Sequence, residues 1–338
     1  MSSSNIRISH VPVSETPIQD ILINRDNCAP YLMSFGFDLG PLKESIQTVG
    51  LINPPLLRRN EKGELEVVLG YKRILAMAEL NRNTVASRIL SHEDMEPHDA
   101  LLMALYDNLA TRLFNPMEKA LILTRLGNHF SDKELCDRFM PLLGLPRHVE
   151  LYRFYLEMEK DFSNPIKEAV AKGQLQLKSA RLLLGLDVES REYLFEFTKK
   201  LMFNINQRHQ LIDIVIDLAN IGGRSIKELL KDPEVMALVN DPRRNMPQKS
   251  RAILALLRAK RFPRLTHVEN QIRKKIASLD LPDGVKIGIP PYLEGSEYTL
   301  EVSFKDGKSL FEKLKDIMDN SNLENFQSLL AEAGTWSE

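Results

Sequence analysis

The spacing of hydrophobic and polar residues predicts a small α/β region at the start of the chain. Leu65–Leu69 is a short β-favouring run that ends at Gly70, which predicts a strand followed by a turn. From Lys72 to Leu80 the apolar residues recur at helical intervals, so a helix is expected to follow. The same reasoning predicts a helix over Leu42–Val49 and strands over Pro55–Arg58 and Val85–Leu90. We take residues 1–115 as the first domain.

From Pro116 onward the pattern predicts one helix after another, and residues 116–240 form the expected second domain. Asn115, Pro116 and Glu118 make a typical helix start, because Asn caps well and Pro suits the first helical position. Ser131 and Glu134 have the spacing of a capping box at a second helix start.

A turn at Leu142–Pro146 separates the helix after Ser131 from a second helix expected from Arg147. Helix, glycine-containing turn and helix is the arrangement of a helix-turn-helix, although an ordinary pair of antiparallel helices fits the spacing equally well. In the DNA-binding motif, the start of the second helix meets the base edges. The residues expected there are Arg147, His148, Glu150, Leu151 and Arg153.

The last part of the chain, residues 276–338, predicts a small helix–strand–strand–helix module. The expected strands are Val285–Ile289 and Tyr298–Phe304, with turn residues including Gly295 and Ser296 between them, and the expected helix is Leu310–Met318. So small a module buries little apolar surface by itself. Self-association is the usual remedy.

The charge distribution changes the first impression given by the composition. The 338 residues contain 45 basic and 46 acidic side chains, a net charge of -1, which by itself disfavours nucleic-acid binding. However, residues 243–275 carry eleven bases and one acid, whereas residues 276–338 carry twelve acids and five bases. We expect 241–275 to be a basic linker or helix that contacts DNA of any sequence, with a solvated linker as the alternative.

The remaining composition points to a reduced, cytoplasmic protein. Cys28 and Cys136 are far apart and have no metal-ligand spacing, so neither a disulfide framework nor a zinc site is expected. No signal-peptide pattern begins the chain, and no apolar run approaches the ~18 residues of a membrane span.

Two short stretches carry candidate chemistry. Gly70–Arg73 stands where a strand meets a helix, and a helix start with glycine and two bases suits phosphate; a capped helix with solvated bases is the alternative. Asp107 and Asn108 offer a carboxylate beside an amide, which suits a divalent cation near phosphates; the alternative is a polar helix end.

In order, these segments resemble the ParB family of plasmid and chromosome partition proteins. Leu42–Pro55 is similar to the family's L-x-x-S-I-x-x-x-G-x-x-x-P segment, and Gly70–Ala76 to its Gly-Glu-Arg-Arg-x-x-A motif. Asp107–Ala120 is similar to its Glu-Asn-Leu-Gln-Arg and Asn-Pro-x-E-x-A motifs, and Ile166–Arg181 to the segment after its helix-turn-helix. The segment from Val268 has the order of its dimerisation domain.

The resemblance implies an α+β multidomain protein. Its parts would be a small α/β ParB/sulfiredoxin-like N-domain, an all-helical helix-turn-helix domain and a C-terminal αββα dimerisation domain. It implies a CTP-gated sliding clamp that binds CTP and Mg²⁺, loads on a centromere-like DNA site and forms a homodimer. A Walker-type partition ATPase would be its partner, and the protein would be nucleoid-associated.

The resemblance also assigns residues. Nucleotide-binding positions are Ser45, Gly50, Asn53, Pro54, Gly70, Lys72, Arg73 and Asn108. Asn108 would hold the metal, and Asp107 would aid hydrolysis in a weak CTPase. Lys178 and Arg181 join the DNA-contacting residues of the helix-turn-helix.

The motifs also depart from the family pattern. Tyr71 replaces Glu, Lys72 replaces Arg and loses bidentate phosphate geometry, and Ala110-Thr111 replaces Gln-Arg with the nearest base at Arg112. A dimeric DNA-binding regulator without nucleotide hydrolysis is therefore one alternative, and a metal-dependent nuclease is another. Sulfiredoxin chemistry is rejected, because it needs a cysteine where Tyr71 stands.

Overall fold

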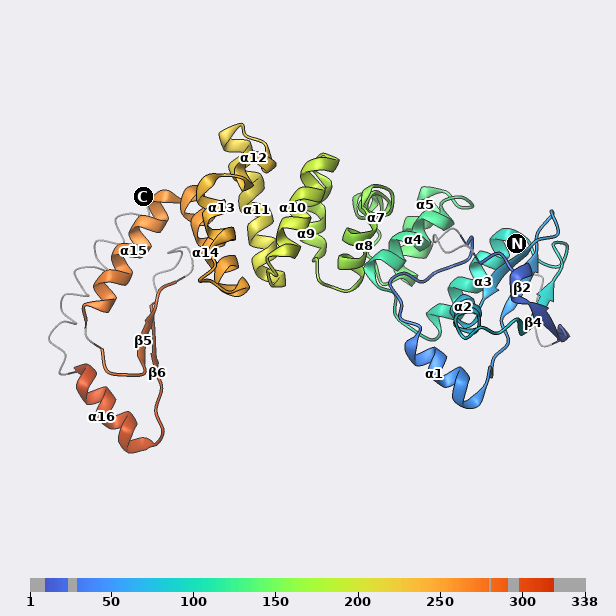
Figure 1. Ribbon diagram of the computed structural model, residues 1–338, viewed down its shortest axis with the longest axis horizontal. Helices are drawn as coiled ribbons and strands as arrows, with labels where there is room; N and C mark the ends of the chain where they lie inside the picture. Colours follow the sequence, from blue (N-terminus) through green and yellow to red (C-terminus); the bar gives the residue numbers. More distant parts are fainter. Residues whose placement is uncertain (1–9, 24–28, 280, 291–297, 319–338) are drawn as a thin grey trace. The chain divides into compact units, whose positions relative to one another are not determined.

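The computed structural model describes residues 10–23, 29–279, 281–290 and 298–318 (Figure 1). It is a mixed α+β structure, mostly helical, with a small sheet near the N-terminus. The chain divides into two compact units, Met1–Phe195 and Glu196–Glu338, which are described separately. The finer division at residues 115, 240 and 275 stays a prediction.

A four-stranded sheet organises the start of the first unit. Its order is β1-β4-β2-β3, with β2 and β4 parallel and the two other pairs antiparallel. The strands are β1 (Val13–Pro17), β2 (Leu56–Arg59), β3 (Leu65–Leu69) and β4 (Thr84–Leu90). Because β3 is followed by α2 (Tyr71–Glu79) before the chain enters β4, the helix start lies at the end of a buried strand.

The hydrophobic pattern located most of these elements correctly. The helix predicted at Leu42–Val49 is α1 (Gly40–Val49), and α3 (Pro97–Leu109) completes the helices around the sheet. Strand β1 was not predicted, because its sequence has no alternating apolar pattern. Its one buried side chain with a partner is polar: the hydroxyls of Thr16 and Ser87 lie 2.6 Å apart across β1 and β4.

The rest of the first unit is helical, as predicted. The helices are α4 (Pro116–Leu126), α5 (Asp132–Glu134), α6 (Met140–Leu142), α7 (Val149–Asp161), α8 (Asn164–Ala171) and α9 (Leu177–Leu184). Helix α10 (Val188–Lys200) includes the division between the two units at Phe195. The capping box predicted at Ser131 is present, and the helix start predicted at Asn115 is a capping box as well, each with its glutamate returning a hydrogen bond to the cap.

The expected helix-turn-helix is modified in two places. A single π-helical turn, η3 (Leu135–Phe139), joins α5 to α6. The second residue of α6 is Pro141, which has no N–H to continue an α-helical ladder. The second helix begins at Val149 with His148 as its N-cap, so the prediction that it begins at Arg147 was wrong. Arg147 and His148 therefore lie just before the first turn of the helix.

The second unit begins with a helical layer and ends in a hairpin and a helix. Its helices are α11 (Ile205–Gly222), α12 (Ile226–Leu230), α13 (Pro233–Asn240), α14 (Met246–Arg261), α15 (Pro263–Ala277) and α16 (Gly307–Met318). The basic segment is thus two helices, α14 and α15. Strands β5 (Val285–Gly288) and β6 (Thr299–Val302) pair antiparallel and are shorter than predicted. The predicted turn at Gly295 lies outside the described residues.

Candidate functional site

The turn from β3 into α2 is built around a glycine that no other residue replaces without rearrangement. Gly70 has φ +89°, in the left-handed region, and is the N-cap of α2. A Cβ at this position would lie 2.8 Å from Nη2 of Arg73. The guanidinium of Arg73 folds back over the turn and donates a hydrogen bond to the carbonyl of Asn53. The structure thereby joins two stretches that the sequence separates by about twenty residues.

Lys72 and Arg73 are half-buried cations beside this turn. Burial lowers the pKa of Lys72, and the nearby charge of Arg112 lowers it further, against the opposing effect of Glu118. Burial also lowers the pKa of Arg73, opposed by the charge of Asp107. A bound anion would stabilise these two cations, because its charge replaces interactions with water that the cations have lost on burial. The arrangement therefore suits phosphate chemically.

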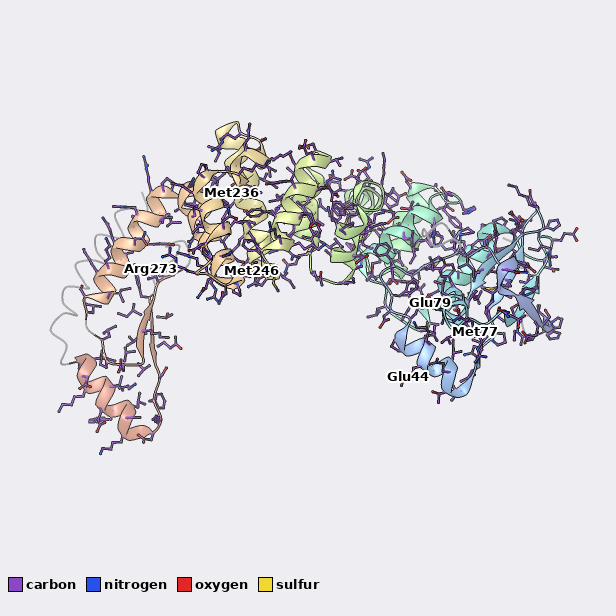
Figure 2. All side chains as sticks on the ribbon, viewed as in Figure 1. Glu44, Met77, Glu79, Met236, Met246 and Arg273 are labelled. Carbon is purple, nitrogen blue, oxygen red and sulfur yellow. The ribbon has the colours of Figure 1, made fainter. Side chains whose placement is uncertain are left out.

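An aromatic and a polar wall lie next to the same helix start. Nζ of Lys72 lies 4.8 Å from the centroid of the Phe37 ring. Phe37 and Tyr71 also line a hollow of about 570 Å³ between α1 and α2, which Lys43 and Glu79 border with an ion pair of 2.9 Å. Glu79, labelled in Figure 2, is on α2. Tyr71, the residue that departs from the expected motif, is thus a wall of this hollow.

Of the nucleotide-binding residues predicted in and after α1, one contacts the Gly70 turn through a hydrogen bond. Asn53 reaches it through its backbone carbonyl. Ser45 lies on the exposed side of α1, and Gly50, with φ +79°, ends that helix. Pro54 is half-buried beside β2. Among the described residues, no hydrogen bond joins Ser45, Gly50 or Pro54 to the Gly70 turn.

Asp107 and Asn108 occupy the last turn of α3, and their side chains make different contacts. The carboxylate of Asp107 is exposed and close enough to Arg73 to act on its pKa. Both polar atoms of the Asn108 side chain make a hydrogen bond within the chain. Its Nδ2 donates to the Ala104 carbonyl at 2.8 Å, and its Oδ1 accepts from Nε of Arg112 at 2.8 Å.

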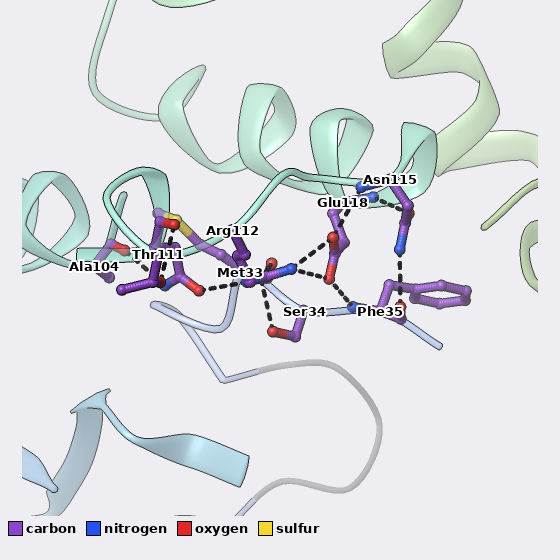
Figure 3. A network of polar contacts seen from close by, with 9 residues as sticks. Met33, Ser34, Phe35, Ala104, Thr111, Arg112, Asn115 and Glu118 are labelled. Carbon is purple, nitrogen blue, oxygen red and sulfur yellow. Dashed lines mark hydrogen bonds and ion pairs between the residues drawn. The ribbon is translucent and has the colours of Figure 1, made fainter. Parts of the chain in front are cut away.

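Arg112 is the centre of a polar network that sequence reasoning missed (Figure 3). Its Nη1 donates to both carboxylate oxygens of buried Glu118, at 2.7 and 2.8 Å. Its Nη2 donates to the Met33 carbonyl at 2.6 Å and to Oγ of Ser34 at 2.9 Å. With the bond to Asn108, every nitrogen of the guanidinium has an acceptor. The network ties the segment before α1 to the junction of α3 and α4.

Glu118 links the same network to the cap of α4. One carboxylate oxygen accepts from the Phe35 N–H at 3.2 Å, and the other accepts from the Asn115 N–H at 3.0 Å. Nδ2 of Asn115 donates to the Phe35 carbonyl at 3.1 Å. The signal for part of this was present in the sequence as a capping box. The hydrogen bonds from Arg112 to Met33 and Ser34 could not be inferred, because these residues lie far away in the chain.

The helix-turn-helix residues present a polar outer side and an aromatic inner side. Arg147, His148, Glu150 and Arg153 are exposed, whereas Leu151 is half-buried. Tyr152 and Phe154 are buried beneath them, and the Tyr152 hydroxyl donates to Asp132 at 3.2 Å, which ties α7 to α5. On α9, Lys178 and Arg181 are exposed, and the Arg181 guanidinium lies 4.6 Å from the Phe154 ring centroid. This packing places α9 beside α7.

The basic segment carries less free charge than its composition suggests. At least five of its eleven bases form ion pairs within the second unit: Arg243 and Arg244 with Asp241, Arg258 with Glu269, Lys260 with Asp232 and Glu234, and Arg261 with Asp217. Three of these four groups of acids lie outside residues 243–275. A sum over a sequence window therefore overestimates the field around α14 and α15.

Comparison with known proteins identifies relatives. The probable chromosome-partitioning protein ParB of Vibrio cholerae is 28% identical over 204 residues, which cover 59% of this chain and 66% of that protein. Stage 0 sporulation protein J of Bacillus subtilis is 28% identical over 217 residues, which cover 62% of this chain and 72% of that protein. Over the matched part, the chain is similar to these partition proteins. The matched part spans about two thirds of these relatives' own lengths.

Two further comparisons add little to this assignment. No model of a known protein family matches the chain. The C-terminally truncated ParB of Caulobacter crescentus, solved with CTP-γ-S, is 20% identical, covers 54% of this chain and 98% of its own, and superposes with a TM-score of 0.26. At that TM-score the structural likeness supports no inference about this ParB-like chain.

The metal assigned to Asn108 by the ParB resemblance does not fit the residues around it. Oδ1 of Asn108, the oxygen that a cation would use, accepts from the positively charged Arg112 instead. The described residues contain no group of three or more His, Cys, Asp or Glu side chains that could hold a metal ion.

Across the described ranges there is also no helix both long and apolar enough to cross a membrane.

Proposed function

We propose that this ParB-like chain is a sequence-specific DNA-binding partition protein. In this proposal it acts as a CTP-gated clamp that loads at a centromere-like site for chromosome or plasmid segregation. The observation that carries the nucleotide part is the Gly70 turn, where half-buried Lys72 and Arg73 meet Asn53 and the charge of Asp107. Motifs from three stretches of the chain contribute to one cationic helix start.

For the nucleotide, the roles follow from the contacts. Gly70 permits a close approach to the N–H groups that begin α2, and Lys72 and Arg73 would contact the phosphates. The hollow lined by Phe37 and Tyr71 would receive the base or ribose. Asp107, exposed beside Arg73, is the group proposed to aid hydrolysis. No step is assigned to a metal ion, because Arg112 uses the Asn108 oxygen.

For DNA, the proposal rests on the exposed side of α7 and the neighbouring helix. Arg153 would contact a base edge, since arginine suits guanine O6 and N7. Arg147 and His148, just before the helix, would contact phosphates. Lys178 and Arg181 on α9 would extend the same surface. A homodimer through α16 and a Walker-type ATPase partner complete the proposal.

One observation favours a second candidate, a dimeric DNA-binding regulator that does not hydrolyse nucleotide. Asn108 is held by Arg112 and by the Ala104 carbonyl, so it is not poised to assist a reaction at phosphate. The two candidates share the DNA surface. They differ in whether nucleotide changes the behaviour of the protein on DNA.

The test is equilibrium binding of radiolabelled CTP to the full chain, with and without DNA. Saturable binding that is lost in Lys72→Gln and Arg73→Gln, but kept in the exposed control Arg82→Gln, is the expected result. Absence of saturable binding to the unmodified protein would overturn the clamp proposal and leave the regulator.

A second measurement tests the clamp itself. CTP should make the protein salt-resistant on closed circular DNA and leave it removable from the same DNA once linearised, since a ring slides off a free end. Equal retention on both forms would contradict topological entrapment.

A further inference from the structure

The second unit contains a hollow that none of the sequence motifs includes. Its volume is about 460 Å³, within the ~300–1,000 Å³ typical of small-molecule sites, and it lies between α11, α14 and α15. Ile214, Leu254 and Phe262 supply apolar walls. A cavity of this size with an apolar floor is suited to a ring or a short hydrocarbon portion of a ligand.

Three arginines line the same hollow, and one of them is held in place. Arg258 donates to Glu269 at 2.7 Å, and the glutamate is buried. Arg251 on α14 and Arg273 on α15, the latter labelled in Figure 2, are exposed. Within the part of the chain that the structure describes, neither Arg251 nor Arg273 forms an ion pair. These two guanidinium groups are therefore available to an anion.

The hollow also carries acceptors, which limits what fits it. Asp213 is exposed on α11 at the same hollow, together with the amide of Gln210. A DNA backbone presents only acceptor oxygens and negative charge, so a carboxylate in the groove works against it. A small molecule that carries both an anion and hydrogen-bond donors is favoured by the same residues.

We propose that this hollow binds a phosphorylated small molecule of mononucleotide size. Its phosphate meets Arg251 and Arg273, since guanidinium groups bind phosphate oxygens in bidentate geometry. An amino or hydroxyl group of the ligand donates to Asp213, and its ring packs against Leu254 and Phe262. The site is separate from the Gly70 turn, and this inference does not rest on the proposed function.

The test uses the full chain carrying Lys72→Gln and Arg73→Gln, which removes the cations of the Gly70 turn. AMP and inorganic pyrophosphate are titrated into this protein by calorimetry. AMP is expected to bind at one site per chain. Arg251→Gln with Arg273→Gln should weaken binding at least about tenfold, as expected for loss of charged hydrogen bonds. The matched control Arg264→Gln, on α15 but outside the hollow, should not change it.

A second variant separates the hollow from its charge. Ala255→Trp places a large ring in the hollow and leaves every arginine, so it should abolish AMP binding and keep retention on non-specific DNA. Failure of AMP to bind at millimolar concentration would overturn the proposal, as would binding unaffected by the double variant. Loss of DNA retention in the arginine variant without any AMP binding would assign the arginines to the DNA backbone instead.

Discussion

Arg112 and Glu118 form an ion pair in which one arginine nitrogen, Nη1, lies 2.7 and 2.8 Å from the two carboxylate oxygens. The glutamate side chain is 4% exposed and the arginine 26%. The pair connects the junction of α3 and α4 to residues 33–35, and the charge of Arg112 lowers the pKa of Lys72. It is therefore a structural element of the candidate site rather than a contact to the ligand.

Arg112→Met should destabilise the first unit by about 3 kcal/mol, because it leaves the buried carboxylate of Glu118 without its partner. Urea unfolding followed by circular dichroism measures this. Lys172→Ala, which removes an exposed pair with Glu168, is the matched control and should cost less than about 0.5 kcal/mol. An equal loss of stability in both variants would show that the buried pair contributes no more to the free energy of unfolding than the exposed pair does.

CTP should bind with about the same affinity in EDTA as in Mg²⁺. The oxygen of Asn108 that would hold the cation accepts from Arg112, and Lys72 and Arg73 already supply positive charge for the phosphates. Equilibrium dialysis in the two buffers measures the difference, with a Mg²⁺-dependent nucleotide-binding protein as the control. A strict requirement for Mg²⁺ would mean that Asn108 is released from Arg112 when nucleotide binds.

Arg153→Gln should reduce binding to the specific DNA site at least about tenfold and leave non-specific retention largely intact, because arginine contacts to guanine carry sequence information. Lys160→Gln, exposed near the end of the same helix, is the control. Gel-shift competition with unrelated DNA provides the measurement. Specificity that persists in Arg153→Gln would remove this residue from base recognition.

The contribution of Tyr152 to stability should depend on pH between about 10 and 12. Burial, the charge of Asp132 and the hydrogen bond to it raise the pKa of Tyr152 to about 12. The unfolded chain loses this proton near pH 10, so rising pH stabilises the unfolded state before the folded one. The stability gap between the native protein and Tyr152→Phe is full below pH 10 and shrinks toward pH 12. A gap that stays constant over this range would contradict the assignment.

Self-association should depend on the outer face of α16. The side chains of Phe311 and Met318 are 72% and 82% exposed, and Leu314 lies between them in the sequence of the same helix. Exposed apolar side chains grouped in this way are typical of a protein–protein contact surface. Phe311→Asp with Leu314→Asp should therefore shift the protein toward monomer in sedimentation. Lys315→Ala, exposed on the same helix, should leave its mass unchanged. An unchanged mass in the double variant would place the dimer contact elsewhere.

The sequence by itself determined the local elements and the order of the motifs. Strand β3, helix α2, the helix start at Asn115, the capping box at Ser131, and the separate strands β5 and β6 follow from patterns within about ten residues. Such patterns record the preferences of neighbouring residues, which remain the same wherever the segment is placed. The start of α7 was misplaced by two residues, because Arg147 and His148 have no strong preference at a helix end.

Only the tertiary structure decided which distant residues meet. It joined Arg73 to Asn53 and Arg112 to Met33 and Ser34, and it neutralised part of the basic segment with acids from elsewhere in the second unit. Strand β1 likewise forms because β4 offers it a partner, with no apolar pattern of its own. Pairings of this kind depend on distances in space, and the spacing of residues along the chain carries no record of them.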